Sequence, residues 1–229
     1  MHVTHSGLIF DIANKSASLI GVDSKLGDEL IIPPIIHGFP LETIEKSVFA
    51  KNTTLVNVGI PASVKVIGEN AFAECLKLKN IKFYTTPRIS STCTLHKHAF
   101  YSCRNLASIQ FPGKVLINGD GVFQNCASLH DIKGKFNSLL ANTFCGCTSL
   151  KSLLFYGKTF ISASAFKQCP ALSTLTFTGN LSEKTSPIAI EQMQRMKIVC
   201  YANSEFVNWA YEGTAIEVMD VHDFFDDLF

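Results

Sequence analysis

The apolar residues of this chain fall into columns that recur every 21–28 residues. Each repeat has an aromatic marker, and the six markers are Phe49, Phe72, Phe100, Phe123, Phe144 and Phe166. An Ile or Leu stands five or six residues before each marker, a Leu six residues after it, and another aliphatic residue nine after it. Repetition at this period is typical of solenoid proteins, in which similar units stack and share a continuous core. The sequence therefore predicts a solenoid of six repeats.

The spacing inside one repeat predicts its local structure, and residues 67–83 (IGENAFAECLKLKNIKF) show it best. The last apolar residues, Ile81 and Phe83, are two apart, which is the period of a strand, so both should point to one side. The earlier apolar residues are three apart, which suits a helical or 3₁₀ turn. Because one strand cannot bury its own face, we expect the strands of successive repeats to form a parallel sheet. Segments such as residues 64–67 predict a second, narrower sheet, and Gly134 predicts a thin point in the core of the fourth repeat.

The segments that flank the repeats have other patterns. Residues 7–22 contain two apolar runs around a polar turn, which predicts a β-hairpin that covers the first edge of the stack. Residues 187–196 predict a short helix with a proline in its first turn, and residues 198–201 predict a last strand. These two elements are expected to form a C-terminal cap. The final ten residues, DVHDFFDDLF, are an acidic and hydrophobic tail, predicted either to dock on that cap or to serve as a linear motif for a partner.

The repeat also resembles that of a known family. The pattern I-G-x-x-A-F-x-x-C-x-x-L-x-x-I-x-F is similar to the repeat of the BspA-like leucine-rich repeat family, and residues 67–83 match it position by position. Residues 30–33 and 198–209 resemble the usual beginning and end of that family. The resemblance implies a curved, non-enzymatic solenoid that binds other macromolecules, as in bacterial and protist surface proteins implicated in adhesion and host-protein binding. Because one fold hosts many functions, the resemblance specifies the fold more closely than the ligand.

From the columns and the resemblance together we predict the fold class. It is an α/β repeat fold, a right-handed leucine-rich-repeat solenoid with a parallel β-sheet ladder, short helical or 3₁₀ turns, a β-hairpin N-cap and a helical C-cap. Residues 1–229 are expected to form a single domain. In this prediction residues 1–40 are the N-terminal hairpin cap, residues 41–180 hold the six repeats, and residues 181–229 are the C-terminal cap and tail.

The overall composition limits the partners. The net charge is +1, which gives no reason to expect nucleic acid or an anionic membrane as the main partner. No apolar run approaches the ~20 residues that a membrane-spanning helix needs. The first residues, MHVTHSGLIFDIANKS, lack the basic start and long apolar core of a signal peptide. The resemblance favours a cell-surface or secreted protein, and the sequence itself leaves a cytoplasmic protein as the alternative.

A column of cysteines stands three residues after five of the markers, at Cys75, Cys103, Cys126, Cys147 and Cys169. A zinc site usually takes paired ligands such as C-x₂₋₄-C, whereas this column supplies one cysteine per repeat. Stacked neighbours would lie about 5 Å apart, within reach of a disulfide, but their side chains should all point the same way into the core. We therefore predict that the marker phenylalanines and this column are structural core residues, with buried free thiols. Cys145, beside the column, is predicted to face outward and to be the most reactive thiol.

Motifs for catalysis or metal binding are missing from the sequence. It contains no G-x-S-x-G, no G-x-x-x-x-G-K-[ST], no G-x-G-x-x-G and no carboxylate pair at a distinctive spacing. His96 and His98 stand two apart, but no third metal ligand stands near them. We therefore predict that the protein is not an enzyme, has no catalytic, cofactor-binding or metal-binding residues, and needs no cofactor.

The solvent-facing strand positions, seven, eight and ten residues after each marker, are the best candidate binding surface. In the central repeats they carry four lysines against one aspartate, and they carry no aromatic residue, which disfavours stacking on sugars or bases. A mildly basic, flat and polar sheet suits a protein surface or an acidic polymer, and a merely solvated face is the alternative. The candidate partner-binding residues are Lys79, Asn80, Lys82, Ser108, Gln110, His130, Asp131, Lys133, Lys151, Ser152, Thr174 and Thr176.

Three functions follow from these observations. The leading hypothesis is a cell-surface or secreted interaction module that binds a protein, such as a host or cell-surface protein, through this face and the loop at residues 84–92. The second is an intracellular scaffold of the same fold. The third, a metal-binding or enzymatic protein, would need a metal or a convergent polar pocket.

Overall fold

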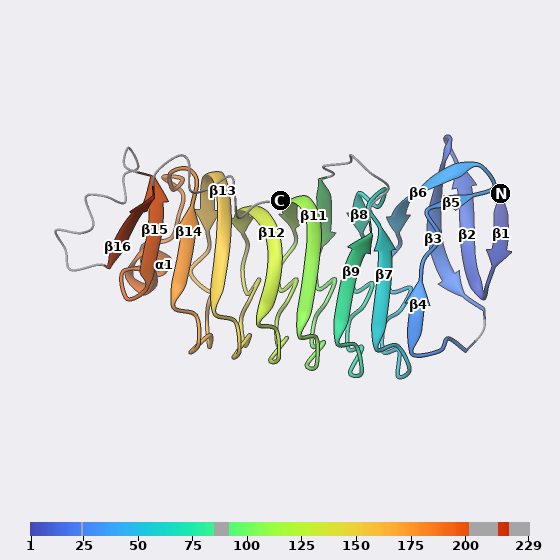
Figure 1. The fold of residues 1–229 in the computed structure, drawn as a ribbon, viewed down its shortest axis with the longest axis horizontal. Helices are drawn as coiled ribbons and strands as arrows, with labels where there is room; N and C mark the ends of the chain where they lie inside the picture. The colour runs from blue at the N-terminus through green and yellow to red at the C-terminus, as the bar shows by residue number, and fades with distance from the viewer. Residues whose placement is uncertain (24, 85–91, 202–214, 220–229) are drawn as a thin grey trace.

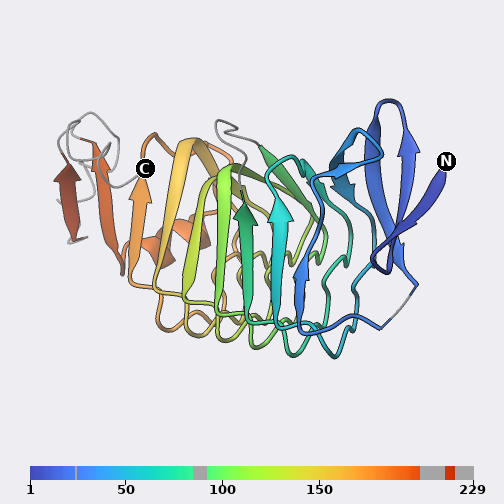
Figure 2. The ribbon, with the colours of Figure 1, turned by 45° about the vertical axis from the view of Figure 1, so that its right-hand side comes forward.

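The computed structural model describes residues 1–23, 25–84, 92–201 and 215–219. These residues form an elongated stack of chain turns, shown from one side in Figure 1 and obliquely in Figure 2. Strands run side by side along the length of the stack, tight turns line its lower edge, and the N-terminus lies at one end (Figure 1). The long axis of the molecule therefore runs across the strands, from repeat to repeat.

One parallel sheet runs the length of the stack, and we call it the ladder sheet. Each strand pairs with the equivalent strand of the next repeat, so that Ile81, Ile109 and Ile132 are direct partners. The predicted parallel sheet is thus confirmed. In order along the stack, the strands are β4 (Glu29–Ile31), β7 (Asn57–Pro61), β9 (Asn80–Tyr84), β11 (Ser108–Asn118), β12 (Asp131–Leu139), β13 (Ser152–Ile161), β14 (Thr174–Phe177), β15 (Lys197–Tyr201) and β16 (Ile216–Met219).

A second, narrower parallel sheet is present, as segments such as residues 64–67 predict. It consists of β3 (Ser16–Val22), β6 (Phe39–Ile44), β8 (Val66–Ile67) and β10 (Cys93–His96), and β10 pairs with the C-terminal part of β11. The strands β11, β12 and β13 are 11, 9 and 10 residues long and continue from the ladder sheet into this second region. The two sheets therefore merge in the middle of the molecule.

The hairpin predicted in residues 7–22 is present at the N-terminal end. The strand β2 (Leu8–Ala13) pairs antiparallel with β3, and β1 (His2–His5) adds a further antiparallel strand. The short β5 (Ile35–Ile36) pairs antiparallel with β6. Because β3 also pairs with β6 in parallel, backbone hydrogen bonds join the hairpin to the second sheet. Its role as a cap stays a prediction, as does the right-handed winding of the stack.

The turns are not helical, which corrects the predicted helical or 3₁₀ turns. Asn70 and Glu74 have positive φ angles of 55° and 59°. Left-handed residues four apart interrupt the regular hydrogen bonding of a right-handed helix. The turn closes instead through single hydrogen bonds, such as that from the Ala73 amide to the Asn70 carbonyl, 3.0 Å. Within the described residues the only helix is α1 (Pro187–Met193), so the chain is a β-solenoid and not an α/β repeat.

The marker phenylalanines form a stack through the core. The ring centroids of neighbouring markers from Phe49 to Phe144 lie 4.9–5.3 Å apart, and their planes are inclined by 2–22°. These five side chains are at most 2% exposed, and Phe166 is buried as well. Each offset aromatic pair contributes about 0.5–1.5 kcal/mol beyond the burial of its surface. One residue per repeat therefore links the first five repeats to one another.

The cysteine column lies beside this stack. Each thiol donates a hydrogen bond to the carbonyl oxygen of the marker phenylalanine one repeat earlier, with Sγ to O distances of 2.9–3.1 Å. In the first repeat Asn52 takes the place of cysteine, and its Oδ1 accepts from the amides of Thr54 and Leu55 at 2.9 and 2.8 Å. Each of these phenylalanine carbonyls also accepts from the backbone amide three residues later, so the thiol adds a second hydrogen bond that joins neighbouring repeats.

Two predictions about single core positions are wrong. Cys145 does not face outward, because it is only 8% exposed in a turn where Asn142 and Gly146 have positive φ, so the alternation of an extended segment does not apply. The core is not thin at Gly134 either. Phe136, two residues later, is fully buried, pairs with Phe155 and packs edge-on against the marker of the next repeat at 5.7 Å. The aromatic column is thus continued by a shift of two residues.

The C-terminal elements partly match the prediction. The helix α1 covers residues 187–193 of the predicted 187–196, and β15 begins one residue before the predicted strand. The strand β16, which the sequence analysis did not predict, pairs in parallel with β15. The predicted tail at residues 220–229 and residues 85–91 of the predicted binding loop lie outside the described residues.

Alkaline pH is expected to destabilise the fold through its buried thiols. Burial raises the pKa of Cys93 and Cys126 to about 12 and that of Cys169 to about 11. A thiol in the unfolded chain titrates near 8.5. Above that pH the unfolded chain loses protons that the folded chain keeps, so stability falls as the pH rises from about 8.5 towards 12.

The urea midpoint should accordingly fall between pH 7.5 and pH 10, under reducing conditions. The urea midpoint of the double variant Cys93→Ala/Cys126→Ala should fall less between the two pH values than that of the unaltered protein, because alanine does not titrate. An equal loss in both proteins would assign the effect to other groups.

Candidate functional site

The outward side of the ladder sheet, here called the ladder face, holds the predicted partner-binding residues. Nine of them lie on strands, namely Asn80 and Lys82 on β9, Ser108 and Gln110 on β11, Asp131 and Lys133 on β12, Ser152 on β13, and Thr174 and Thr176 on β14. Lys79, His130 and Lys151 each stand directly before a strand. The pairing brings them into rows across the strands, because Lys82, Gln110 and Lys133 are direct neighbours.

A chain of polar side chains crosses the N-terminal half of the ladder face. Asn57 donates to Glu29, Asn80 donates to Asn57 at 2.7 Å, and Ser108 donates to Asn80 at 2.9 Å. Farther along, Gln110 donates to Asp131 at 3.5 Å. Side chains that hydrogen-bond to one another across strands stabilise the sheet. They also have fewer free donors and acceptors with which to bind a partner. The sequence pattern places these amides in one set with the lysines, whereas in the structure the amides bond to neighbouring side chains of the sheet.

Four lysines of the ladder face make no ion pair with any described residue. In the described part of the chain, the ion pairs are made by other side chains, and none involves Lys79, Lys82, Lys133 or Lys151. Two of these lysines lie on strands that have a partner strand on each side. They therefore project from a rigid surface with their charge open to solvent.

An apolar area at the N-terminal end of the ladder face was missed by sequence reasoning. The Tyr84 ring lies beside Gly59, whose added Cβ would be 3.5 Å from that ring and 3.6 Å from Ile31. The Tyr84 hydroxyl donates to the Ile32 carbonyl, and burial raises the pKa of that hydroxyl. Ile31 is 75% exposed. The glycine at an outward strand position is the sequence signal that a neighbouring side chain crosses there.

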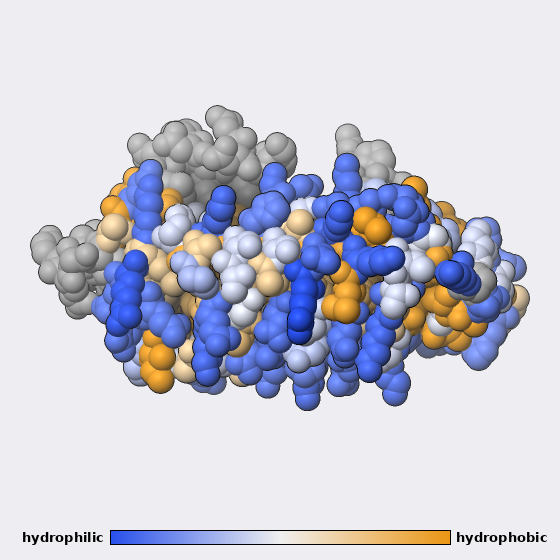
Figure 3. Space-filling view, turned by 90° about the horizontal axis from the view of Figure 1, so that it is seen from below, coloured by the Kyte–Doolittle hydropathy of each residue, from blue (hydrophilic) through white to orange (hydrophobic). Residues whose placement is uncertain are grey.

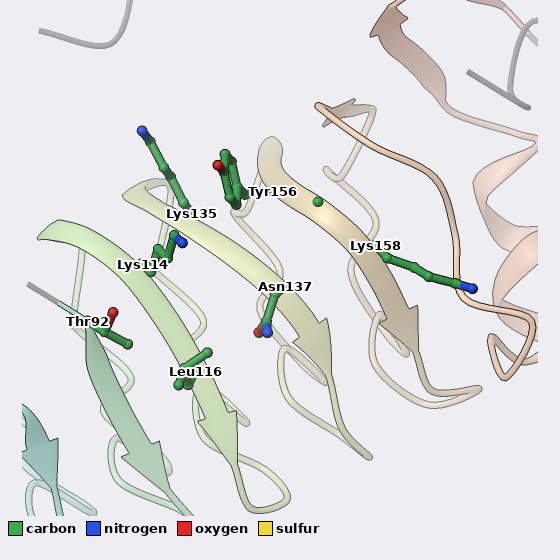
Figure 4. A pocket seen from close by; sticks show the side chains of 8 residues that line it. Thr92, Lys114, Leu116, Lys135, Asn137, Tyr156 and Lys158 are labelled. Carbon is green, nitrogen blue, oxygen red and sulfur yellow. The ribbon is translucent and has the colours of Figure 1, made fainter. Parts of the chain in front are cut away.

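A pocket of about 360 Å³ is the second feature that the sequence analysis did not predict. It lies where the ladder sheet and the second sheet merge, and Figure 4 shows it from close by. We call it the lysine pocket, and it is lined by Thr92, Lys114, Leu116, Lys135, Asn137, Tyr156, Gly157 and Lys158. The Nζ atoms of Lys114 and Lys135 lie 5.0 and 5.7 Å from the centroid of the Tyr156 ring. An exposed cation over an aromatic ring contributes about 0.5–1 kcal/mol.

Other surfaces of the described residues show weaker evidence of a binding site. The lower edge of the stack carries hydrophilic side chains interspersed with small hydrophobic areas (Figure 3). His96 ends β10, and His98 lies in the following turn with its ring 4.9 Å from that of Tyr101. Across residues 1–23, 25–84, 92–201 and 215–219, no three metal-ligating side chains gather into a site. The helical part of the same residues includes nothing long and apolar enough to cross a membrane.

The repeat pattern matches a known sequence family. Residues 87–188 match six copies of the BspA type leucine rich repeat region. The matched part, somewhat less than half of the chain, is a BspA-type leucine-rich repeat region. The resemblance drawn from residues 67–83 is therefore confirmed, and the match points to no catalytic family. A search of curated proteins finds no match to this leucine-rich repeat chain.

Several solved structures of leucine-rich repeat proteins are similar to this chain, and the two with TM-scores above 0.5 share its fold. The T. pallidum leucine-rich repeat protein (TpLRR) is 22% identical, with a TM-score of 0.62 over 90% of this chain and 99% of that one. A leucine-rich repeat protein from Eubacterium ventriosum is 18% identical, with a TM-score of 0.51 over 75% of this chain and 50% of that one. A leucine rich cell surface protein from Faecalibacterium prausnitzii is 17% identical, with a TM-score of 0.43 over 88% and 76% of the two chains.

Proposed function

We propose that this chain is a non-enzymatic interaction module that binds a protein partner through its ladder face. Support comes from open lysine charges on strands that have a neighbouring strand on each side. Lys82 and Lys133 project from strands that are hydrogen-bonded on both sides. A surface that is already ordered loses little conformational entropy on binding. The module is proposed to act at the cell surface or after secretion, which is the setting implied by the family.

The partner is proposed to be a host or cell-surface protein with an acidic surface. Lys79, Lys82, Lys133 and Lys151 outnumber the single Asp131 in the central repeats. Complementary charge contributes association rate and specificity more than raw affinity. The apolar area around Tyr84 supplies the kind of desolvated aromatic contact that carries binding energy in protein interfaces. The loop at residues 84–92 follows directly and is kept in the proposed surface.

Reversing the charge of the ladder lysines is expected to abolish partner binding. The variant replaces Lys79, Lys82, Lys133 and Lys151 by Glu, and binding is measured to immobilised extracellular-matrix proteins, fibronectin and laminin among them. Four exposed ion pairs at about 0.5 kcal/mol each predict a loss of more than about thirtyfold in affinity. The thermal unfolding midpoint should change little, because side chains on this face stand outside the core.

A matched control reverses four exposed lysines elsewhere, Lys25, Lys77, Lys167 and Lys184, and so makes the same change in net charge. Affinity should remain close to that of the unaltered protein. An equal loss in the two variants would indicate an effect of net charge alone. Unchanged binding in the first variant would move the protein-binding site away from the ladder face.

A further inference from the structure

The lysine pocket lies between two irregularities of the merged sheet. From Gln110 to Lys114, β11 has three intervening residues where β12 has one between Lys133 and Lys135, an excess of two. From Phe155 to Phe160, β13 has four intervening residues where β12 has one between Phe136 and Ser138, an excess of three. Strand bulges re-aim side chains and are over-represented beside functional sites.

The bulge in β13 contains a large part of the pocket wall. It holds Tyr156, Gly157 and Lys158, and Gly157 has a φ of +69°. The Tyr156 side chain is 42% exposed, which is unusual for a large ring in this chain. Without the bulge, alternation along the strand would continue, and three consecutive residues would not all line one pocket. The bulge therefore presents an aromatic ring to solvent beside two lysines.

Two of the pocket lysines stand in an unfavourable arrangement. Lys114 and Lys135 are direct partners in the parallel pairing of β11 and β12. Like charges directly opposite each other in a sheet are destabilising. Within the described residues neither forms an ion pair, whereas Lys158 pairs with Glu183 at 3.2 Å. Figure 4 shows Lys114 and Lys135 near the Tyr156 ring, while Lys158 points away from them. The Tyr156 ring offsets only part of this repulsion, and a bound anion would relieve the rest.

The surroundings of these charges identify the class of anion. The strands β11, β12 and β13 each have neighbours on both sides, so the pocket offers no free strand edge to which a peptide could add. Its other lining groups are a hydroxyl, an amide and a partly exposed ring, from Thr92, Asn137 and Tyr156. Sugars suit such groups, because hydroxyls bond to amides and the faces of sugar rings stack on aromatic rings.

The spacing of the charges adds a further condition. Paired strands lie about 4.8 Å apart. A ligand that contacts both lysines therefore needs anionic groups that are closely spaced along the long axis of the molecule. We propose that the lysine pocket binds a linear sulfated polysaccharide, with its sulfate groups on Lys114 and Lys135 and a sugar ring against Tyr156. This site is separate from the proposed protein-binding ladder face.

The test is direct titration of the full chain with a heparin decasaccharide in 0.15 M salt, followed by calorimetry. The variant Lys114→Ala/Lys135→Ala should bind about tenfold more weakly, since two contacts of up to about 1 kcal/mol each are lost. The control Lys77→Ala/Lys167→Ala removes the same charge from exposed turns and should stay within about twofold, because distant surface charges are screened. Tyr156→Phe should bind as the unaltered protein does, whereas Tyr156→Ala should bind more weakly.

Two further probes decide the ligand class. A chemically desulfated decasaccharide and poly-L-glutamate of similar length should both bind at least about tenfold more weakly than heparin if sulfate groups on a sugar chain are recognised. Equal binding of poly-L-glutamate would show an acidic-peptide site and overturn the proposal. So would equal losses in the pocket and control variants, or no heparin binding at all. Because the ladder variant keeps Lys114 and Lys135, failure here leaves the protein-binding proposal standing.

Discussion

Replacing Phe123 by alanine is expected to destabilise the fold by about 3–5 kcal/mol. The ring is fully buried and stacks between Phe100 and Phe144, with centroid distances of 5.3 and 5.2 Å. It also meets Phe111 edge-on at 6.4 Å. Removing it leaves a cavity in the middle of the stack and breaks three aromatic contacts at once, so each half of the solenoid loses part of its support. Urea unfolding followed by circular dichroism measures the change.

Leu76→Ala is the matched control for this substitution. Leu76 is 51% exposed in a turn, so its loss should cost less than about 1 kcal/mol. Phe123→Leu should fall between the two, because leucine refills much of the volume but restores no ring contact. A change below about 1 kcal/mol for Phe123→Ala would mean that neighbouring repeats collapse into the space and that the phenylalanine column does not hold the stack together.

Replacing Gly119 by alanine is expected to have an effect of similar size. An added Cβ would lie 2.3 Å from the amide nitrogen and 2.5 Å from the Cα of Lys97, in the turn of the previous repeat. Both are backbone atoms, so the clash is relieved only by separating two repeats. The φ of +154° adds strain that L side chains rarely tolerate. We expect a loss of about 3 kcal/mol or more, measured by the same urea unfolding.

Gly38→Ala separates backbone strain from the clash. Gly38 also has a positive φ, +87°, but nothing lies within 4 Å of an added Cβ. Its substitution should cost about 1–2 kcal/mol, which is the price of the backbone conformation alone. Equal effects at the two glycines would mean that strain and not the close approach of neighbouring repeats explains the glycine at position 119.

The rows of buried residues could be read from the sequence because strand and turn spacing are local properties. The aliphatic residues at Ile81, Ile109 and Ile132 predicted a parallel sheet, and they are direct partners in it. Strand period and repeat length together specify which side chains face inward. The turns were predicted less well. Positive φ angles at residues such as Glu74 and Asn70 depend on how one repeat rests on the next, and no apolar spacing reports them.

The candidate site was only partly predictable for a related reason. The alternation of side chains along each strand places the lysines of the ladder face on the outward side, so these residues could be identified from the sequence. The lysine pocket could not, because it depends on bulges in two strands on either side of a regular one. A bulge is defined by the pairing with a neighbour, and pairing is absent from a single repeat.

The sequence by itself determined the repeat, the buried columns and the outward rows of this protein. These features depend on the spacing of residues within one repeat, because that spacing decides which side chains face inward. The same positions are then buried in each copy of the repeat. The tertiary structure alone decided the shift that puts Phe136 in the aromatic column, the inward position of Cys145 and the meeting of Lys114, Lys135 and Tyr156. The shift and the meeting arise where unequal strands pair by bulging, whereas Cys145 faces inward because of the positive φ angles in its turn.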